Sequence, residues 1–336
     1  MTKTSSRTAA NTGTPNSGSA ARIIDTHHHI FPPGYTSRHL ERLLEISSIV
    51  PAADYLNWSA RGALDRMDQA GVATAINSIT SPGVWFENGE AARAEARECN
   101  EFGAGLARDF PGRFGMFGAV PLPDTEGSLR EIEYVLDVLK LEGIGVMTNY
   151  SGKLLGDPAF AAVFDELNRR KALVFVHPTT PCCLTPIPGV GVPILDFPVD
   201  TTRTMASLVF SGTFSRCPDI RFIFPHGGGV MPSVVQRIAS VVQRLKPEER
   251  ATKLPKGLEY ELRRQYYDLA SVGSSPVGMT AVLQLYPISQ LLFGSDEPFN
   301  STVEMSAALS KLGLRANDLR AIRRENALRL FPRFGV

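Results

Sequence analysis

From Arg22 to the C-terminus, short apolar runs alternate with longer segments of helical periodicity, and this alternation limits the possible folds more than any other feature. It is typical of strand–helix units arranged around a parallel sheet. Eight runs are predicted to be strands: Arg22–Thr26, Val72–Ile79, Arg113–Leu122, Gly143–Thr148, Ala172–His177, Arg221–Pro225, Tyr266–Ser271 and Gln290–Gly294. We therefore expect an α/β fold, a (β/α)8 TIM barrel, with an open doubly wound sheet as the alternative.

The segments between these runs carry helix signals. Ser59 is suited to cap a helix that runs through Met67 and ends at Gly71. Further helices are predicted at Glu90–Asp109, Glu126–Leu141, Asp157–Arg170, Asp200–Ser215, Pro232–Leu245, Val277–Leu285, Thr302–Leu312 and Asp318–Phe331. A long loop rich in proline and glycine is expected from Thr179 to about Val199.

Composition narrows the class of protein. The chain has 336 residues, of which 43% are hydrophobic, enough for residues 22–336 to form one large catalytic barrel domain. Residues 1–21 are rich in small polar side chains and are expected to form a disordered leader. A formal net charge of +1, with both signs interspersed, argues against nucleic acid or a membrane as partner. No apolar run is long enough to span a bilayer, and four cysteines without disulfide spacing suggest a reduced, cytoplasmic enzyme.

Three of the six histidines stand together as His27, His28 and His29 at the end of the first predicted strand. Alternate side chains of a strand point to the same face, so His27 and His29 are expected to project together while His28 points away. Two neighbouring imidazoles can supply two ligands of a divalent metal ion.

Other potential metal ligands lie at the ends of later strands. His177 ends the fifth strand, His226 follows the sixth and Asp296 follows the eighth. In a (β/α)8 barrel, these strand ends meet at the rim that carries the chemistry. His27, His29, His177 and Asp296 therefore predict a site for Zn²⁺ or another first-row divalent ion, with His226 as a further ligand or an acid–base group.

Several neighbouring features have less specific interpretations. His39 lies among charged residues and is expected on the solvated surface. Gly227–Gly229 before a helix can cradle a phosphate, but it lacks the spacing of a nucleotide fingerprint, and close backbone approach explains it equally well. Cys182 and Cys183 have no ligand spacing and are left out of the predicted site.

The motifs Asp-Thr-His-His-His, Phe-Val-His-Pro, Pro-His-Gly-Gly-Gly and Phe-Gly-Ser-Asp-Glu-Pro-Phe resemble those of the amidohydrolase superfamily. Within it, the chain is most similar to the branch of 2-amino-3-carboxymuconate-6-semialdehyde decarboxylase and the non-oxidative aromatic acid decarboxylases. The segments 79–83 and 196–203 look most like those of 6-methylsalicylate decarboxylases. The resemblance runs from about Arg22 to Phe331.

This resemblance implies roles for particular residues. His27, His29, His177 and Asp296 match the metal ligands of the family, and His226 matches its active-site histidine. Arg237 matches an arginine that reaches the site of a neighbouring subunit and holds a carboxylate, which implies a homodimer or a higher homo-oligomer.

The sequence departs from the family pattern at informative places. The region from Pro51 to Trp58 lacks the family's second carboxylate-binding arginine, so a monocarboxylic aromatic acid fits better than a dicarboxylate. Gly229 stands where resorcylate-type decarboxylases carry a glutamate. The fourth strand ends in Thr148 and Asn149 without the bridging lysine of binuclear hydrolases, which favours one metal ion, Zn²⁺ or alternatively Mn²⁺.

These observations predict a metal-dependent decarboxylase that converts a salicylate-type acid into CO₂ and a phenol. Asp296 is the expected proton donor and His226 its partner, while Trp85, Phe86 and Phe197 either sandwich the aromatic ring or pack within their loops. A metal-dependent hydrolase of a lactone, ester or amide is the alternative. A metal-binding protein without turnover is disfavoured, because an open rim differs from a closed structural site.

Overall fold

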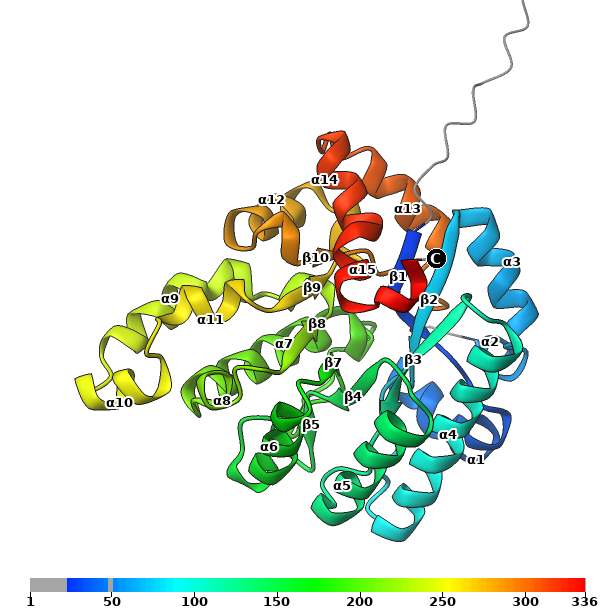
Figure 1. The fold of residues 1–336 in the computed structure, drawn as a ribbon, viewed down its shortest axis with the longest axis horizontal. Coiled ribbons are helices and arrows are strands. Elements are labelled where there is room, and N and C mark those ends of the chain that lie inside the picture. The colour runs from blue at the N-terminus through cyan, green and yellow to red at the C-terminus, as the bar shows by residue number, and fades with distance from the viewer. Residues whose placement is uncertain (1–22, 48–50, 336) are drawn as a thin grey trace, which may run out of the picture.

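Eight parallel strands form the centre of the protein in the computed structural model, which describes residues 23–47 and 51–335 (Figure 1). Neighbouring strands follow one another along the chain: β1 (Ile23–His29), β2 (Val72–Ser78), β3 (Phe114–Ala119), β4 (Gly143–Met147), β7 (Leu173–His177), β8 (Arg221–Phe224), β9 (Tyr266–Asp268) and β10 (Leu291–Leu292). A small antiparallel hairpin, β5 (Asn149–Tyr150) and β6 (Lys153–Leu154), follows β4. The predicted (β/α)8 barrel is confirmed.

The barrel closes between β1 and the segment that follows β10. The Thr26 amide donates to the Phe293 carbonyl at 2.9 Å, and the Asp296 amide donates to the His27 carbonyl at 2.8 Å. The His29 amide donates to the Glu297 carbonyl at 2.9 Å. These bonds exclude an open sheet, and they bring Asp296 to the same rim as His27 and His29.

Helices surround the strands. Their bounds are α1 (Pro33–Ser47), α2 (Ala52–Leu56), α3 (Ala60–Ala70), α4 (Gly89–Asp109), α5 (Thr125–Glu133), α6 (Ala161–Arg169), α7 (Val192–Phe210), α8 (Thr213–Arg216), α9 (Met231–Gln243), α10 (Pro247–Lys253), α11 (Leu258–Arg263), α12 (Pro276–Leu285), α13 (Thr302–Ser310), α14 (Ala316–Arg320) and α15 (Asn326–Leu330). Short 3-10 and π-helical turns are η1 (Tyr134–Val138), η2 (Pro158–Phe160), η3 (His226–Gly228), η4 (Val272–Ser274), η5 (Ile288–Gln290), η6 (Ala321–Glu325) and η7 (Pro332–Gly335). As predicted, the Ser59 side chain caps α3 and Gly71 ends it in the left-handed conformation.

Two helices above the rim differ from the sequence prediction. The segment after Pro32 forms α1, which we had not predicted. The expected loop up to Val199 ends earlier, because α7 begins at Val192 and continues through Pro198. Proline interrupts helical hydrogen bonding, so the sequence argued for a later start. Tertiary contacts offset this cost: buried Asp200 accepts hydrogen bonds from Thr148 at 2.5 Å and from Asn149 at 2.9 Å.

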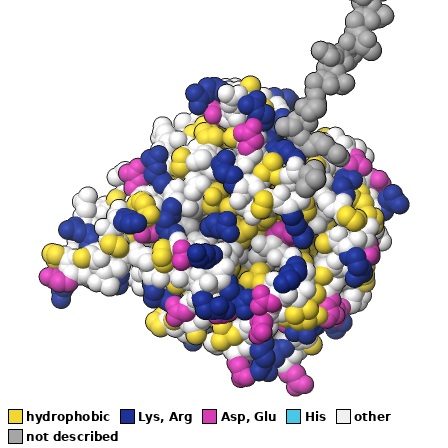
Figure 2. Space-filling model, viewed as in Figure 1, with side chains coloured by type: hydrophobic (Ala, Val, Ile, Leu, Met, Phe, Trp, Pro, Cys, Tyr) yellow, Lys and Arg dark blue, Asp and Glu magenta, His cyan; other side chains and the backbone are white. Residues whose placement is uncertain are grey.

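Apolar side chains fill the barrel interior. The C-terminal segment of the chain covers the end of the barrel opposite the rim that carries Asp296, His27 and His29. Strand residues such as Ile24, Phe117 and Phe175 pack in one cluster with Leu330 and Phe331. In Figure 1, α15 lies across the strands near the centre of the view. Figure 2 shows the same face with basic and acidic side chains interspersed, without a stripe of one sign. We therefore assign this end of the barrel a role in stability and not in catalysis.

Two further predictions concern the N-terminal leader and membrane-spanning helices. The expected leader, residues 1–21, lies outside the described residues. Within the described ranges, no helix combines the length and apolar character needed to cross a membrane.

Replacement of Phe331 by alanine tests the role of the C-terminal closure. Phe331 is 2% exposed and its ring lies 5.9 Å from that of Phe117, edge to face. We expect Phe331→Ala to lower the free energy of unfolding by about 3–5 kcal/mol, since it removes buried area and leaves a cavity. Urea denaturation measures this loss, and Val277→Ala at an 82% exposed position serves as the control. Equal stability of the two variants would contradict the assignment.

Candidate metal centre

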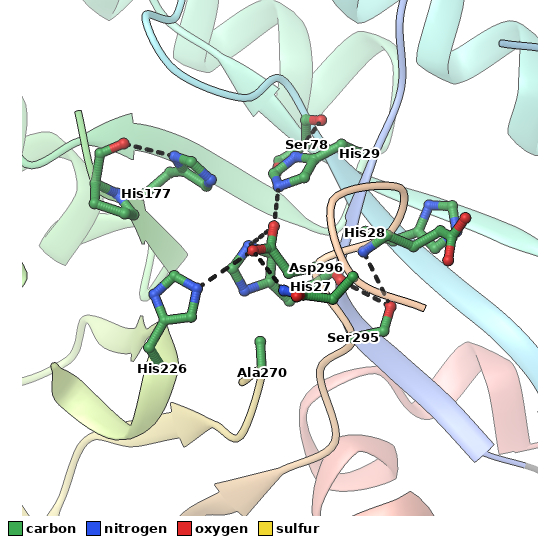
Figure 3. A network of polar contacts seen from close by, with 12 residues as sticks. His27, His28, His29, Ser78, His177, His226, Ala270, Ser295 and Asp296 are labelled. Carbon is green, nitrogen blue, oxygen red and sulfur yellow. Dashed lines mark hydrogen bonds and ion pairs between the residues drawn. The ribbon is translucent and has the colours of Figure 1, made fainter. Parts of the chain in front are cut away.

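Four side chains converge at the C-terminal rim of the barrel. One ligand atom from each of His27, His29, His177 and Asp296 lies within 4.8 Å of the others. Nε2 of His27 and Nε2 of His29 lie 3.2 and 3.1 Å from the same oxygen, Asp296 Oδ1. Figure 3 shows these residues pointing toward a common centre, with His28 directed away from it. The structure thus brings together the four side chains that the sequence singled out as ligands.

Hydrogen bonds at the opposite ring nitrogens orient these imidazoles. Nδ1 of His27 lies 3.0 Å from Asp268 Oδ2, and Nδ1 of His177 lies 2.7 Å from the Pro178 carbonyl oxygen. Nδ1 of His29 lies 3.3 Å from the Ser78 carbonyl oxygen. A ring that donates from Nδ1 leaves Nε2 free as a metal ligand. The buried His27 Nε2 makes no hydrogen bond, although the Asp296 carboxylate oxygen lies 3.2 Å away, and this donor set fits a divalent cation.

His226 stands beside the centre and contacts the second oxygen of Asp296. Its Nε2 lies 3.5 Å from Asp296 Oδ2, an oxygen that also accepts from the side-chain Nδ2 of Asn300 at 3.3 Å. Asp296 therefore directs one oxygen to the ligand nitrogens and the other to a polar pair. Both residues have left-handed backbone conformations, with φ of 55° at His226 and 68° at Asp296. Such strain persists only where the surroundings impose it and is common at functional sites.

Charges in the centre are strongly coupled. Burial lowers the pKa of His27, but the carboxylates of Asp268 and Asp296 outweigh it and raise this pKa to about 10. Burial, with repulsion from His29 and His27, holds the pKa of His177 well below its ordinary value. Burial raises the pKa of Asp296, but His27, His226 and His29 outweigh it and hold this pKa well below its ordinary value. A metal ion here competes with the proton on His27.

A cavity of about 590 Å³ opens above the centre. His177, His226 and Asp296 form part of its wall, together with polar side chains from the rim loops. Its remaining described lining residues are Leu43, Ile46, Tyr55, Thr80, Ser81, Pro193, Ile194, Phe197, Pro198, Gly229, Ser271, Val272, Ser275, Phe299 and Asn300. None of the described lining residues is a lysine or an arginine.

Two aromatic rings flank the ligands inside this cavity. The Phe197 ring lies 6.3 Å from that of His177, and the Phe299 ring lies 5.5 Å from that of His29. The sequence placed Phe197 in a loop, but in the structure it belongs to α7. Both rings are therefore available to a planar ligand.

Trp85 and Phe86 are placed elsewhere and do not line this cavity. Trp85 donates from Nε1 to Ser151 Oγ at 3.2 Å, and Phe86 stacks on His39 at 3.8 Å between ring centres. His39 also lies 3.0 Å from a Glu95 oxygen. The expectation of a solvated His39 is wrong, because α1 packs this side chain against Phe86 and Glu95.

The less specific features of the sequence now have structural explanations. A Cβ atom on Gly229 would lie 2.0 Å from the Pro198 carbonyl oxygen, so close backbone approach accounts for glycine there. Cys182 and Cys183 are exposed and are not part of the ligand cluster. Thr148 and Asn149 bind Asp200, and Lys153 lies exposed on the β5–β6 hairpin. None of these three residues lines the cavity above the metal centre.

Arg237 lies exposed on α9, outside the cavity of its own chain. The helices α9, α10 and α11 project away from the barrel in Figure 1.

Sequence reasoning missed several supporting residues. Asp25 accepts from the amides of His27 and Ser295 at 3.1 and 3.0 Å and from Ser295 Oγ at 2.5 Å. Burial raises the pKa of Asp25 to about 7, against the hydrogen bonds from Ser295 and His27 that lower it. Asp268 orients His27 and also accepts from the His226 amide at 3.2 Å. The seventh predicted strand, Tyr266–Ser271, places Asp268 in its interior, whereas the observed β9 ends at Asp268 and so brings its side chain to the rim.

A (β/α)8 barrel with three histidines and one aspartate at its C-terminal rim defines the class of metal-dependent barrel enzymes. Within this class the chain belongs to the amidohydrolase family, whose sequence profile matches residues 24–333.

Named relatives of the chain are decarboxylases. The chain is 34% identical to decarboxylase yanB of Aspergillus niger, over 93% of this chain and 88% of the relative. It is 32% identical to 6-methylsalicylic acid decarboxylase acuB of Aspergillus aculeatus, over 92% and 96% of the two chains. The fold is similar to that of 5-carboxyvanillate decarboxylase from Novosphingobium aromaticivorans, solved with manganese and 4-hydroxy-3-methoxy-5-nitrobenzoic acid. That comparison has a TM-score of 0.84 at 21% identity, covering 94% of this chain and 97% of the other.

Substitution of Asp268 tests its role in orienting His27. An asparagine keeps the shape but loses the charge and one acceptor, so we expect Asp268→Asn to weaken Zn²⁺ affinity by about 10–100-fold. Competition with a chromophoric chelator measures this affinity without any substrate. The control is Asp219→Asn at an exposed position. Unchanged affinity in Asp268→Asn would show that the carboxylate is dispensable for metal binding.

Proposed function

We propose that this chain is a metal-dependent, non-oxidative decarboxylase of a salicylate-type acid, which releases CO₂ and a phenol. The observation that carries the proposal is the division of Asp296 between two tasks. Its Oδ1 faces the ligand nitrogens of His27 and His29, and its Oδ2 faces His226 at the floor of an apolar cavity. The named relatives that act on 6-methylsalicylic acid support the same substrate class.

The chain's own residues define how such a substrate would bind. His27, His29, His177 and Asp296 would hold one divalent ion, which supplies an electrophile and a template for a carboxylate and the adjacent phenol oxygen. Three imidazole ligands favour Zn²⁺, while the manganese of the solved neighbour makes Mn²⁺ the alternative. Phe197 and Phe299 line the cavity near the rings of His177 and His29, and we expect them to contact the aromatic ring of the substrate.

Proton transfer is assigned to Asp296 and His226. Direct loss of CO₂ from an aromatic ring would leave an aryl anion of high energy. Transfer of a proton through Asp296 Oδ2 to the ring carbon that bears the carboxylate avoids this anion. Because the pKa of Asp296 is held well below its ordinary value, Oδ2 carries this proton only in transit from His226. Cleavage of the carbon–carbon bond then returns its electron pair to the ring, restores aromaticity and releases CO₂. His226 lies within reach of Oδ2 and transfers a replacement proton to it from water, which completes the catalytic cycle.

The first experiment separates a decarboxylase from the alternative hydrolase. Zn²⁺-loaded and Mn²⁺-loaded protein is incubated with 6-methylsalicylate and with aryl lactones, and CO₂, the phenol and the hydrolysis products are quantified. We expect CO₂ and the phenol in equal amounts, and loss of turnover on metal removal by chelation. Asp296→Asn should lower kcat by about 10²–10⁴-fold or more, since it removes both a proton donor and one of the proposed metal ligands. Lactone hydrolysis without CO₂ release would favour the hydrolase.

The second experiment tests the predicted homodimer and the role of Arg237. Because Arg237 is exposed on a projecting helix, we propose that it binds the substrate carboxylate in the neighbouring subunit's site. Arg237→Ala and Asp296→Asn should each be inactive alone. After mixing with subunit exchange they should regain activity, because one site of each mixed dimer combines both intact residues. Arg244→Ala, at another exposed arginine of the same region, should keep its activity unmixed. A monomer by light scattering, or no recovery on mixing, would contradict this arrangement.

A further inference from the structure

The cavity above the metal centre is larger than one substituted benzene ring requires. Its volume of about 590 Å³ falls within the range of roughly 300–1,000 Å³ that is typical of pockets for drug-sized ligands. The titratable side chains of the cavity, which are suited to the reacting end of the substrate, belong to one set of residues. His177, His226 and Asp296 come from strand ends and the loops that follow them.

A second set of lining residues is apolar and comes from helices that lie above the rim. Leu43 and Ile46 are on α1, Tyr55 is on α2, and Pro193 and Ile194 are on α7. Helices α1 and α7 contact each other. Leu43, Ile46 and Tyr55 are 1%, 5% and 3% exposed, so this wall is already packed without a ligand. A preformed apolar wall binds a hydrocarbon without first reorganising.

Charge is absent from this part of the cavity. Among the described lining residues, Asp296 and two histidines alone can carry charge, and all three belong to the metal centre. The Arg237 proposed to enter from the neighbouring subunit binds the reacting carboxylate. A second carboxylate or an ammonium group on the substrate would therefore lose its hydration without gaining a partner among the described lining residues. An alkyl substituent would instead be removed from water, which is favourable.

We propose that the substrate is a salicylate whose ring carries an alkyl or alkenyl chain longer than methyl, with this chain lying between α1 and α7. The inference rests on the proposed decarboxylase function and names its substrate class. Leu43, Ile46 and Ile194 are specificity-determining residues that contact the chain, while the ring remains beside Phe197 and Phe299.

The test is a substrate series on the metal-loaded enzyme. Salicylates with methyl, propyl and pentyl substituents at ring position 6, and a parallel series at position 4, are compared by the kcat/KM of CO₂ release. Each buried methylene should raise kcat/KM roughly fourfold in at least one series, until the chain fills the cavity. A maximum at methyl in both series would overturn the inference while leaving the decarboxylase function intact. Absence of CO₂ from every salicylate would overturn both.

A matched pair of variants locates the chain within the cavity. Ile194→Trp adds bulk to a lining residue that is 61% exposed, so folding should be preserved. We expect the ratio of kcat/KM for pentyl over methyl substrate to fall by at least about tenfold, since one methylene's worth of lost space already costs roughly 10-fold or more. Val138→Trp, at an equally exposed position outside the cavity, should leave the ratio at the wild-type value. An unchanged ratio in Ile194→Trp would overturn the placement of the chain against α7.

Discussion

Backbone hydrogen bonds between β1 and the segment after β10 close the barrel, and the geometry of the candidate metal centre follows from them. These bonds join residues that are far apart in the chain, such as His27 and Asp296. They use backbone groups, so they fix the height of each residue along the barrel regardless of side chain. With that register, Asp296 Oδ1 comes to 3.2 and 3.1 Å from the ring nitrogens of His27 and His29. The same bonds that complete the sheet therefore assemble the ligands.

Buried carboxylates stabilise the contact between β1 and the segment after β10. Asp25 joins the two sides by accepting from both His27 and Ser295, and Glu297 accepts from Thr302 and contacts the Arg66 side chain. Asp268 fixes the ring of His27 and the backbone of His226. Each of these groups is costly to bury and is stabilised by several donors, which makes the network rigid. Rigidity matters because metal affinity depends on small errors in ligand position.

Helices α1 and α7 convert this rim into an enclosed site. They supply the apolar walls above the metal centre, and Gly229 allows the α7 backbone at Pro198 to approach the loop after β8. Phe197 and Phe299 then lie near the ligand histidines from two separate elements. The candidate metal centre and the apolar wall of the cavity thus arise from different parts of the chain, which allows one to vary without the other.

The barrel, the family and the four side chains of the candidate metal centre could be predicted from the sequence alone, because each prediction rests on a local pattern. Short apolar runs of strand length, followed by residues such as His177 and Asp296, can be recognised in the sequence without knowledge of any long-range contact. Three features depend on long-range contacts: the start of α7 before Pro198, the packing of His39 on Phe86 and the orientation of His27 by Asp268. In each case the deciding interaction joins residues distant in sequence: Asp200 with Thr148, α1 with Glu95, β9 with β1. Local propensity carries no information on such partners, and their contact energies outweigh it.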